Sequence, residues 1–426
     1  MTSARQIRNW FRCISPRATT AALAVAVVLT IVAIQTVQAQ TFQVLHTFTG
    51  GADGYGPSAG LTMDEGGNLY GTTYQGGTQG LGTVFKLMRK NSQWVFVPLY
   101  GFAGGNDGAH PYARVIFGPD GTLYGTTNEQ GGGYCGGYGC GTVFNLRPPP
   151  TACKTALCPW TERVIYHFSG GSGDGGNPLA EVTFDQAGNL YGTTAYGGPA
   201  GNGTLYELMP ANGGWTESVL YAFSFSPDGA EPVANVMFDK AGNLFGTTEQ
   251  GGAYEFGTVF QLTQSGSGWT EKTLYSFSDG SDGAFPSLGL IFDASGNLYG
   301  ATGYGGSSRT GTAFELTPSN DSWNFNLIYT FTGVSYEDGP MYGNLAMDGA
   351  GNVYGVTYGN GLYDCGTVFK LTPSNGTWTE TVLHDFTCGN DSGFPVGGVV
   401  LDKMGNIYGT ASGGPFEAGV VWEITP

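Results

Sequence analysis

One short motif, Leu-Tyr-Gly-Thr-Thr or a close variant of it, recurs seven times along this chain of 426 residues. Its aromatic position is filled by Tyr70, Tyr124, Tyr191, Phe245, Tyr299, Tyr354 and Tyr408. The spacings are 54, 67, 54, 54, 55 and 54 residues, and the long interval contains an insertion around Arg147–Pro159. A regular period of this length indicates a propeller or a solenoid.

Each repeat contains four short apolar or alternating segments, separated by turns rich in Gly, Asn and Asp. In the fourth repeat we expect strands a to d at Val233–Phe238, Leu244–Thr248, Gly257–Leu262 and Trp269–Phe277. Four short strands joined by such turns make one blade of a β-propeller. No segment has a convincing helical period, so the predicted fold is all-β.

The two ends of the repeat region complement each other. The region starts with a lone d-type strand, Phe42–Phe48, and ends with a c-type strand, Val420–Ile424. The first can supply the strand that the seventh repeat lacks, which closes the ring and removes an unpaired edge. An open solenoid, the alternative, needs polar caps that the sequence lacks. We therefore predict a seven-bladed β-propeller with four antiparallel strands per blade, closed by the N-terminal strand.

Residues 1–39 have the features of a secretory signal peptide. Arginines precede an apolar segment, Ala21–Ile34, and Val37-Gln38-Ala39 matches a small-residue cleavage site. An uncleaved N-terminal anchor is the alternative. We expect export to the periplasm, the cell surface or the medium, with residues 40–426 as a single propeller domain. Its repeats span approximately residues 58–102, 112–168, 178–223, 232–277, 286–331, 341–386 and 395–426, and residues 42–48 complete the last.

The chain is acidic, with 33 acidic and 16 basic residues. Four of the basic residues lie in the predicted signal peptide, so the mature chain has a net charge of −21. Such a surface repels the phosphates of nucleic acids and anionic lipids, and we expect neither as a partner. Aromatic residues make up 14% of the chain, which argues against disorder.

Two segment types carry a resemblance to a known family. One is the string Gly-Asn-Leu-Tyr-Gly-Thr-Thr or its variants at Gly188–Thr194, Gly242–Thr248 and Gly296–Thr302, and the other is the Gly-Thr-Val-Phe type at Gly82–Leu87, Gly257–Leu262 and Gly366–Leu371. On these residues the chain resembles the GloVer tandem-repeat proteins of bacteria. The resemblance covers essentially the whole mature chain and implies an exported, propeller-like protein. It implies no particular activity, because the family has none that is settled.

The mature chain has six cysteines, and an even number in an exported protein indicates disulfides. In an antiparallel blade the b–c and d–a loops lie on one face, and the a–b and c–d turns on the other. This arrangement predicts the pairs Cys135–Cys140 in a b–c loop, Cys153–Cys158 in the inserted c–d turn, and Cys365–Cys388 at adjacent ends of strands c and d. A zinc site is the alternative, although the spacing fits it less well.

Recurrent aspartates follow strand d in Asp-Gly sequences, usually with a proline three residues on from the glycine. They are Asp53, Asp107, Asp174, Asp228, Asp282 and Asp338, with Asp391 in a variant. One aspartate per loop cannot supply the six to eight oxygen ligands that calcium takes, so we interpret them as turn residues and expect no metal.

Candidate ligand-binding residues lie where the repeats differ. Strand a lines the central tunnel, and one of its alternating positions is always aliphatic and must face the packed sheets. The other position then faces the tunnel, with Tyr112 and Tyr342 nearer the mouth and a variable residue just before the proline. The resulting candidates are Arg114, Glu181, Asn235, Asn344, His110, Asn177, Glu231, Tyr112 and Tyr342. Arg114 and Glu181 come from neighbouring blades and could form a pair. The alternative is that these residues only solvate a water-filled tunnel.

Three functions fit these observations. The first is a binding module for a polar ligand, a glycan or a protein, on the face of the b–c and d–a loops. The second is a lyase or hydrolase with Glu181 or Glu231 as general base, His110 as acid and Arg114 holding the substrate. The third is a structural repeat protein without a specific ligand. The chain contains four histidines and no phosphate-binding loop or metal-binding histidine pair, so we expect no cofactor. We expect a monomer.

Overall fold

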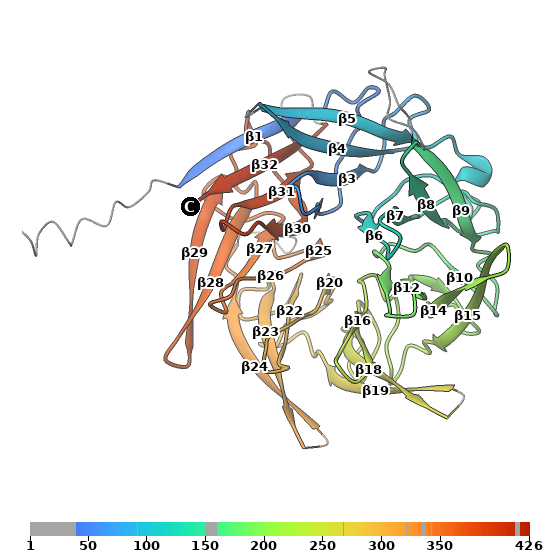
Figure 1. Cartoon of the computed structure of the whole chain (residues 1–426). Coiled ribbons are helices and arrows are strands. Elements are labelled where there is room, and N and C mark those ends of the chain that lie inside the picture. Colours follow the sequence, from blue (N-terminus) through green and yellow to red (C-terminus); the bar gives the residue numbers. More distant parts are fainter. Residues whose placement is uncertain are drawn as a thin grey trace, which may run out of the picture. The chain divides into compact units, whose positions relative to one another are not determined.

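The seven repeats fold into seven four-stranded antiparallel sheets around a central axis (Figure 1). This computed structural model describes residues 40–91, 93–149, 160–266, 268–320, 322–333, 338–341, 343–413 and 418–426. The predicted signal peptide, Tyr342 and the predicted pair Cys153–Cys158 lie outside the described residues. The body Phe42–Thr425 is one unit with the architecture of a seven-bladed β-propeller, which confirms the fold predicted from the repeat.

The first four blades follow one pattern. Blade 1 has β2 (Thr62–Met63), β3 (Leu69–Thr73), β4 (Thr83–Lys90) and β5 (Gln93–Gly101), and blade 2 has β6 (Ile116–Phe117), β7 (Leu123–Thr127), β8 (Thr142–Arg147) and β9 (Thr161–His167). Blade 3 has β11 (Thr183–Phe184), β12 (Leu190–Thr194), β14 (Thr204–Ala211) and β15 (Gly214–Ala222). Blade 4 has β16 (Met237–Phe238), β17 (Leu244–Thr248), β18 (Thr258–Ser265) and β19 (Gly268–Ser276).

The last three blades continue this pattern until the chain ends. Blade 5 has β21 (Ile291–Phe292), β22 (Leu298–Thr302), β23 (Thr312–Ser319) and β24 (Ser322–Thr330), and blade 6 has β26 (Ala346–Met347), β27 (Val353–Thr357), β28 (Thr367–Ser374) and β29 (Thr377–Asp385). Blade 7 has β30 (Pro395–Leu401), β31 (Ile407–Ala411) and β32 (Val420–Thr425), with β1 (Thr41–Thr47) as its outer strand. Short pairings join β10 (Gly175–Gly176) to β13 (Tyr196–Gly197), and β20 (Leu288–Gly289) to β25 (Gly343–Asn344).

The ring closes as the phase of the repeat predicts. The strand order in the last sheet is β1-β32-β31-β30, and the blue β1 lies beside the red β32 in Figure 1. The backbone N–H of Phe48 donates to the carbonyl of Gly419 at 2.9 Å. The ring of Phe42 stacks on His384 of blade 6, with 3.7 Å between ring centroids. The N-terminal strand therefore joins the last blade and also packs against its neighbour.

The predicted strand a of blade 4 is longer than the observed one. Only Met237–Phe238 pair with β17, whereas we expected Val233–Phe238. The carbonyl of Ala234 instead accepts a hydrogen bond at 2.9 Å from the hydroxyl of Thr193, which belongs to blade 3. The equivalent contact recurs between blades 1 and 2, where the Thr72 hydroxyl donates to the Ala113 carbonyl at 3.0 Å. The inner segments of these blades are thus hydrogen-bonded to the preceding blade.

The two threonines of the repeat motif have different partners. The first donates to the next blade, as Thr193 does. The second lies within hydrogen-bonding distance of a threonine on strand c of its own blade, as Thr194 and Thr204 show, with 2.8 Å between their hydroxyl oxygens. Both threonines are buried, and a buried hydroxyl without a partner is destabilising. In blades 1 to 4 the motif thus supplies one bond to the next blade and one bond within its own sheet, whereas Ala301, Val356 and Ala411 replace one threonine in each of blades 5 to 7.

At the outer edge of the ring, one position of strand d lies at the contact with the preceding blade. At three contacts this position is a Phe that stacks on the preceding blade; for example, Phe96 stacks on His46 and Phe325 stacks on Tyr275. At others it is a glutamate, such as Glu162 or Glu217. Burial, followed by the charge of Asp107, raises the pKa of Glu162 to about 8.

Glu217 and Glu271, at the same position in blades 3 and 4, also have raised pKa values. Burial and the charge of Asp174 raise the pKa of Glu217 to about 7. Burial raises the pKa of Glu271 to about 7 with a contribution from Asp228, although a hydrogen bond from Thr273 opposes the shift. In the folded protein these carboxyls keep their protons to a higher pH than in the unfolded chain. Their contribution to stability is present below a pH of about 4.5 and is lost as the pH rises through 7 to 8.

The triple variant Glu162→Gln, Glu217→Gln, Glu271→Gln should therefore flatten part of the pH dependence of stability. As the pH rises from 5 to 8.5, we expect the midpoint of chemical denaturation to fall more in the wild type than in the variant, because a glutamine cannot ionise. Glu65→Gln, at an exposed turn, is the control. Parallel pH curves for the wild type and the triple variant would contradict this explanation.

Candidate functional site

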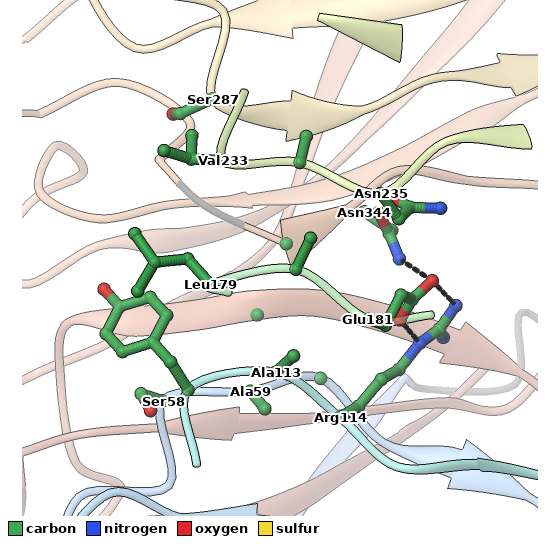
Figure 2. Close-up of a pocket in the computed structure, with 16 residues that line it drawn as sticks. Ser58, Ala59, Ala113, Arg114, Leu179, Glu181, Val233, Asn235, Ser287 and Asn344 are labelled. Atoms are coloured by element: carbon green, nitrogen blue, oxygen red, sulfur yellow. Dashed lines mark hydrogen bonds and ion pairs between the residues drawn. The ribbon is translucent and has the colours of Figure 1, made fainter. Parts of the chain in front are cut away.

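An ion pair crosses the central tunnel. Arg114 and Glu181 extend from the inner segments that precede β6 and β11, at the same register one blade apart. The Nε and Nη2 atoms of Arg114 donate to the two carboxylate oxygens of Glu181, with 2.8 Å between Nη2 and Oε1 (Figure 2). The amide of Asn344, from blade 6, donates to the same Oε1 at 2.9 Å. Three of the polar residues predicted to face the axis, Arg114, Glu181 and Asn344, therefore form one network across it.

Burial and charge act in opposite directions on Arg114. Burial lowers the pKa of its guanidinium, but the charge of Glu181 and the hydrogen bond between them outweigh this, and the net pKa is raised. Only 9% of the Glu181 side chain is exposed. A bidentate pair of this kind is stable when both partners are satisfied, and removal of one leaves a buried charge. The pair is therefore already fully engaged without a ligand.

Glycines close the other side of the tunnel. A Cβ atom added to Gly289 would lie 2.1 Å from the Oδ1 atoms of both Asn235 and Asn344. One added to Gly60 would lie 2.0 Å from the carbonyl oxygen of Gly397. The cavity that remains, which includes Tyr112 in its wall, has a volume of about 40 Å³. Ligand pockets usually measure about 300–1,000 Å³, so this cavity has room for a few water molecules only.

The residues predicted for catalysis lie in separate networks. Arg114 and Glu181 bind each other, whereas Nδ1 of His110 is 2.9 Å from the Tyr74 carbonyl oxygen. Its Nε2 lies 3.7 Å from the carboxylate of Glu129. The amide of Gln250 donates to Glu231 at 3.0 Å. His110 and Glu231 do not line the cavity that Arg114 and Glu181 line.

Residues at the tunnel mouth adopt an unusual backbone conformation. The position before the proline has a φ of +57° at His110 and Asn177, +53° at Glu231, and +55° at Phe285 and Phe394. This left-handed region costs roughly 1–2 kcal/mol for a residue other than glycine. Blade 1 has a glycine there, which shows that the fold accepts one.

A backbone hydrogen bond sets each of these residues beside the residue that follows strand b. The N–H of Glu249 donates to the carbonyl of Glu231 at 3.0 Å, and that of Asn128 to His110 at 3.1 Å. Asn177 also donates its side-chain amide to the Asn128 carbonyl at 2.9 Å. The mouth is therefore lined by two residues from every blade, and sequence analysis identified only one of them. The position that sequence analysis missed is occupied, in blades 1 to 7 in turn, by Tyr74, Asn128, Ala195, Glu249, Gly303, Tyr358 and Ser412.

The missed position holds the most perturbed carboxyl of the mouth. Burial raises the pKa of Glu249 to about 7, and the charge of Glu231 adds to the shift. Burial raises the pKa of Tyr112 to about 12, with further contributions from Glu249, Tyr74 and Tyr358. The pKa of Tyr196 is also raised, by burial and then by both glutamates. Tyr112 of blade 2 and Tyr196 of blade 3 thus both lie in the electrostatic field of Glu249. Only the variation of this position between repeats could have revealed it from sequence.

Exposed tyrosines gather on the same face. Among the described residues, every tyrosine with an exposed side chain lies in a b–c or d–a loop, and Tyr134 is 83% exposed. These tyrosines are Tyr55, Tyr134, Tyr138, Tyr196, Tyr254 and Tyr363. Leu362, which is 82% exposed, lies beside the last of them. Exposed aromatic side chains in one area are typical of a surface that binds a partner.

Disulfides hold two of these loops. Cys135–Cys140 clips the loop that carries Tyr134 and Tyr138, and Cys365–Cys388 ties the base of the loop with Tyr363 to the end of strand d. The structure thus contains both of the predicted pairs that lie within the described residues. A loop fixed in this way loses less conformational entropy when it binds a ligand.

Loss of the two disulfides should have unequal effects. The cysteines of the Cys365–Cys388 pair are 23 residues apart in sequence, and those of the Cys135–Cys140 pair are 5 residues apart. On the chain-entropy scale these correspond to about 3 and about 2 kcal/mol. We expect Cys365→Ser/Cys388→Ser to lower the denaturation midpoint more than Cys135→Ser/Cys140→Ser. The reverse order would show that loop strain, rather than chain entropy, dominates.

Charge is unevenly distributed between the two faces. The described carboxylates of the b–c and d–a loops are Asp53, Asp107, Glu129, Asp174, Glu181, Asp228, Glu231, Glu249, Glu255, Asp279, Asp282, Asp338, Asp364 and Asp391. The described basic residues of these loops are Arg114, which is paired, and Arg309. The other described basic residues, on the outer strands and the opposite turns, are Lys86, Arg89, Lys90, Arg147, Arg163, Lys240, Lys272, Lys370 and Lys403. The loop face is therefore the more acidic one.

The described residues lack the features of two other kinds of site. They contain no group of three or more His, Cys, Asp or Glu side chains placed to hold a metal ion. They also contain no helix that is long and apolar enough to cross a membrane.

The class of the protein is therefore a seven-bladed β-propeller with a tunnel closed by its own side chains. The family follows from the repeat itself. The model of the Gloeobacter/Verrucomicrobia repeat matches residues 30–162 and 136–349, so the chain belongs to that family, as the resemblance to GloVer proteins predicts. A comparison with curated proteins found no match.

Solved structures share the fold at low sequence identity. The extracellular domain of a protein from B. thetaiotaomicron assigned as a hybrid two-component system has a TM-score of 0.55 and 12% identity, over 90% of this chain and 39% of that one. This chain thus spans less than half of that structure. A Bacteroides uniformis protein assigned as a 6-phosphogluconolactonase has a TM-score of 0.50 and 13% identity, over 83% and 89%. An ulvan lyase has a TM-score of 0.52 and 9% identity, over 87% and 94%. These likenesses show the fold alone.

Proposed function

We propose that this protein is an exported binding module, and that its ligand site is the face formed by the b–c and d–a loops. One observation carries the proposal: the exposed tyrosines of the described residues all lie on this face. A tyrosine offers a large, rigid contact surface with a polar end, which suits glycans and proteins alike. The disulfides support export, because such bonds persist in oxidising compartments. Cleavage after Ala39 would then release the mature propeller.

The mouth residues predicted from sequence belong to this site as its central part. His110, Asn177 and Glu231 adopt left-handed conformations there, and Tyr112 lies in the electrostatic field of Glu249. Arg114, Glu181, Asn235 and Asn344 are deeper and, in our proposal, form the floor on which the ligand rests. The lyase or hydrolase alternative has less support, because its proposed acid, base and arginine lie in separate networks.

Replacement of exposed tyrosines tests the proposal. We expect Tyr134→Ala/Tyr138→Ala/Tyr254→Ala to weaken binding to any ligand found on a glycan or peptide array by at least about tenfold, since each aromatic contact contributes roughly 1 kcal/mol or more. The melting temperature should not change, because these rings are exposed.

Control substitutions separate this face from the rest of the surface. Met404→Ala and Leu327→Ala remove exposed apolar side chains at a turn of the opposite face and on an outer strand. These variants should bind like the wild type. Equal loss in the tyrosine variant and the controls, or no loss in either, would overturn the proposed site.

A further inference from the structure

We propose that the loop face docks a lysine- or arginine-rich segment of another protein; this inference rests on the proposed function and names the partner's chemistry. The first argument is charge. Among the described residues, the loops combine many carboxylates with two basic residues, Arg114 and Arg309, and Arg114 is paired with Glu181. An acidic surface attracts a basic partner and repels an acidic glycan or another anion.

Exposed carboxylates at three loop tips are available for such a partner. Glu255, Asp279 and Asp364 are exposed, and among the described residues no donor is bonded to their carboxylates. All three have a positive φ, of +73°, +56° and +57°. Glycine or asparagine would fit this conformation at least as well as these residues do. These three carboxylates are therefore exposed and without a bonded donor among the described residues, so a cationic partner can reach them.

The mouth offers a second, deeper contact for a cation. Glu249 and Glu231 repel each other at half-buried positions, and no basic side chain of the described residues contributes to the environment of Glu249. An ammonium or guanidinium group beside them would relieve this repulsion. Tyr112 and Tyr196 are in the same environment, and aromatic rings attract cations by their electron-rich faces.

The extent of the surface favours a protein segment over a small free amine. The exposed tyrosines lie on loops of blades 2, 3, 4 and 6, with Tyr55 between blades 7 and 1. A single amine could engage the mouth but could not reach these loops together. An extended peptide can place one basic side chain at Glu249 and others over the acidic tips.

Binding of a labelled twelve-residue peptide of alternating lysine, arginine and serine to the mature, disulfide-bonded protein provides the test. We expect fluorescence anisotropy to show saturable binding that weakens at least about tenfold between 0.05 and 0.3 M salt. Spermidine should compete only weakly. The same peptide with acetylated lysines and with citrulline in place of arginine should not bind.

Matched variants locate the charge that matters. The triple variant Glu255→Gln/Asp279→Asn/Asp364→Asn should weaken binding several-fold. Addition of Glu249→Gln to this triple variant should weaken binding further. Glu65→Gln/Glu207→Gln/Glu315→Gln removes three charges outside the loop face and should leave binding unchanged. Equal loss in both triple variants would show general attraction to an acidic protein and would overturn the inference, as would binding of the uncharged peptide.

The two proposals can fail separately. If the basic peptide does not bind but a neutral glycan or peptide binds and is lost in Tyr134→Ala/Tyr138→Ala/Tyr254→Ala, the loop face is a binding site and the basic partner is wrong. If spermidine binds as tightly as the peptide, the cation site stands but the protein partner is wrong. If the tyrosine variant retains all binding found by either route, both proposals fail.

Discussion

The pairing of β1 with β32 holds the ring of seven blades together. Blades 1 to 6 complete their sheets with local hairpins, but blade 7 obtains its outer strand from the other end of the chain. Without it, the edge of β32 would be unpaired and the aromatic contact between Phe42 and His384 would be lost. The inner segments also depend on closure, because Thr410 of blade 7 donates to the carbonyl of Ala59 in blade 1 at 2.8 Å. Everything at the axis relies on this geometry.

Closure explains why the tunnel and the mouth have different characters. Seven inner segments converge at the axis, and the space between them is filled by Arg114 and Glu181 on one side and by glycine backbones on the other. The floor is therefore rigid and offers little volume. Variation between repeats is then expressed at the mouth and in the loops above it, where side chains do not have to fit a closed ring. This division favours the loop face as the place of the binding site that we propose.

Much of the fold could be predicted from sequence, because one motif reports on local structure seven times. Strand b of blade 4 has the predicted bounds Leu244–Thr248, and the cysteine pair Cys365–Cys388 follows from antiparallel register. The pairing of Arg114 with Glu181 follows from equal positions in adjacent blades. In each case the contact is fixed by the repeat period or by hairpin geometry, which the sequence displays directly.

Other features depend on contacts between blades that no local pattern encodes. In blade 4 only Met237–Phe238 pair with strand b, and the carbonyl of Ala234 bonds to a threonine hydroxyl of the preceding blade instead. Glu231 has a left-handed backbone conformation. The sequence does not predict it, because glycine is the residue expected in that conformation. Glu249 and Tyr112 belong to blades 4 and 2 and interact only because all inner segments meet at one axis. These features depend on the closed ring, and Glu249 lies at the position that sequence analysis missed.

Removal of β1 tests the closed ring most directly. A chain that begins at Thr49 lacks the strand Thr41–Thr47 and Phe48, whose backbone bonds to Gly419. We predict that it unfolds at a markedly lower temperature than the mature chain, and that a synthetic peptide with the sequence of residues 41–48 restores the lost stability. An unchanged melting temperature for the truncated chain would contradict this account.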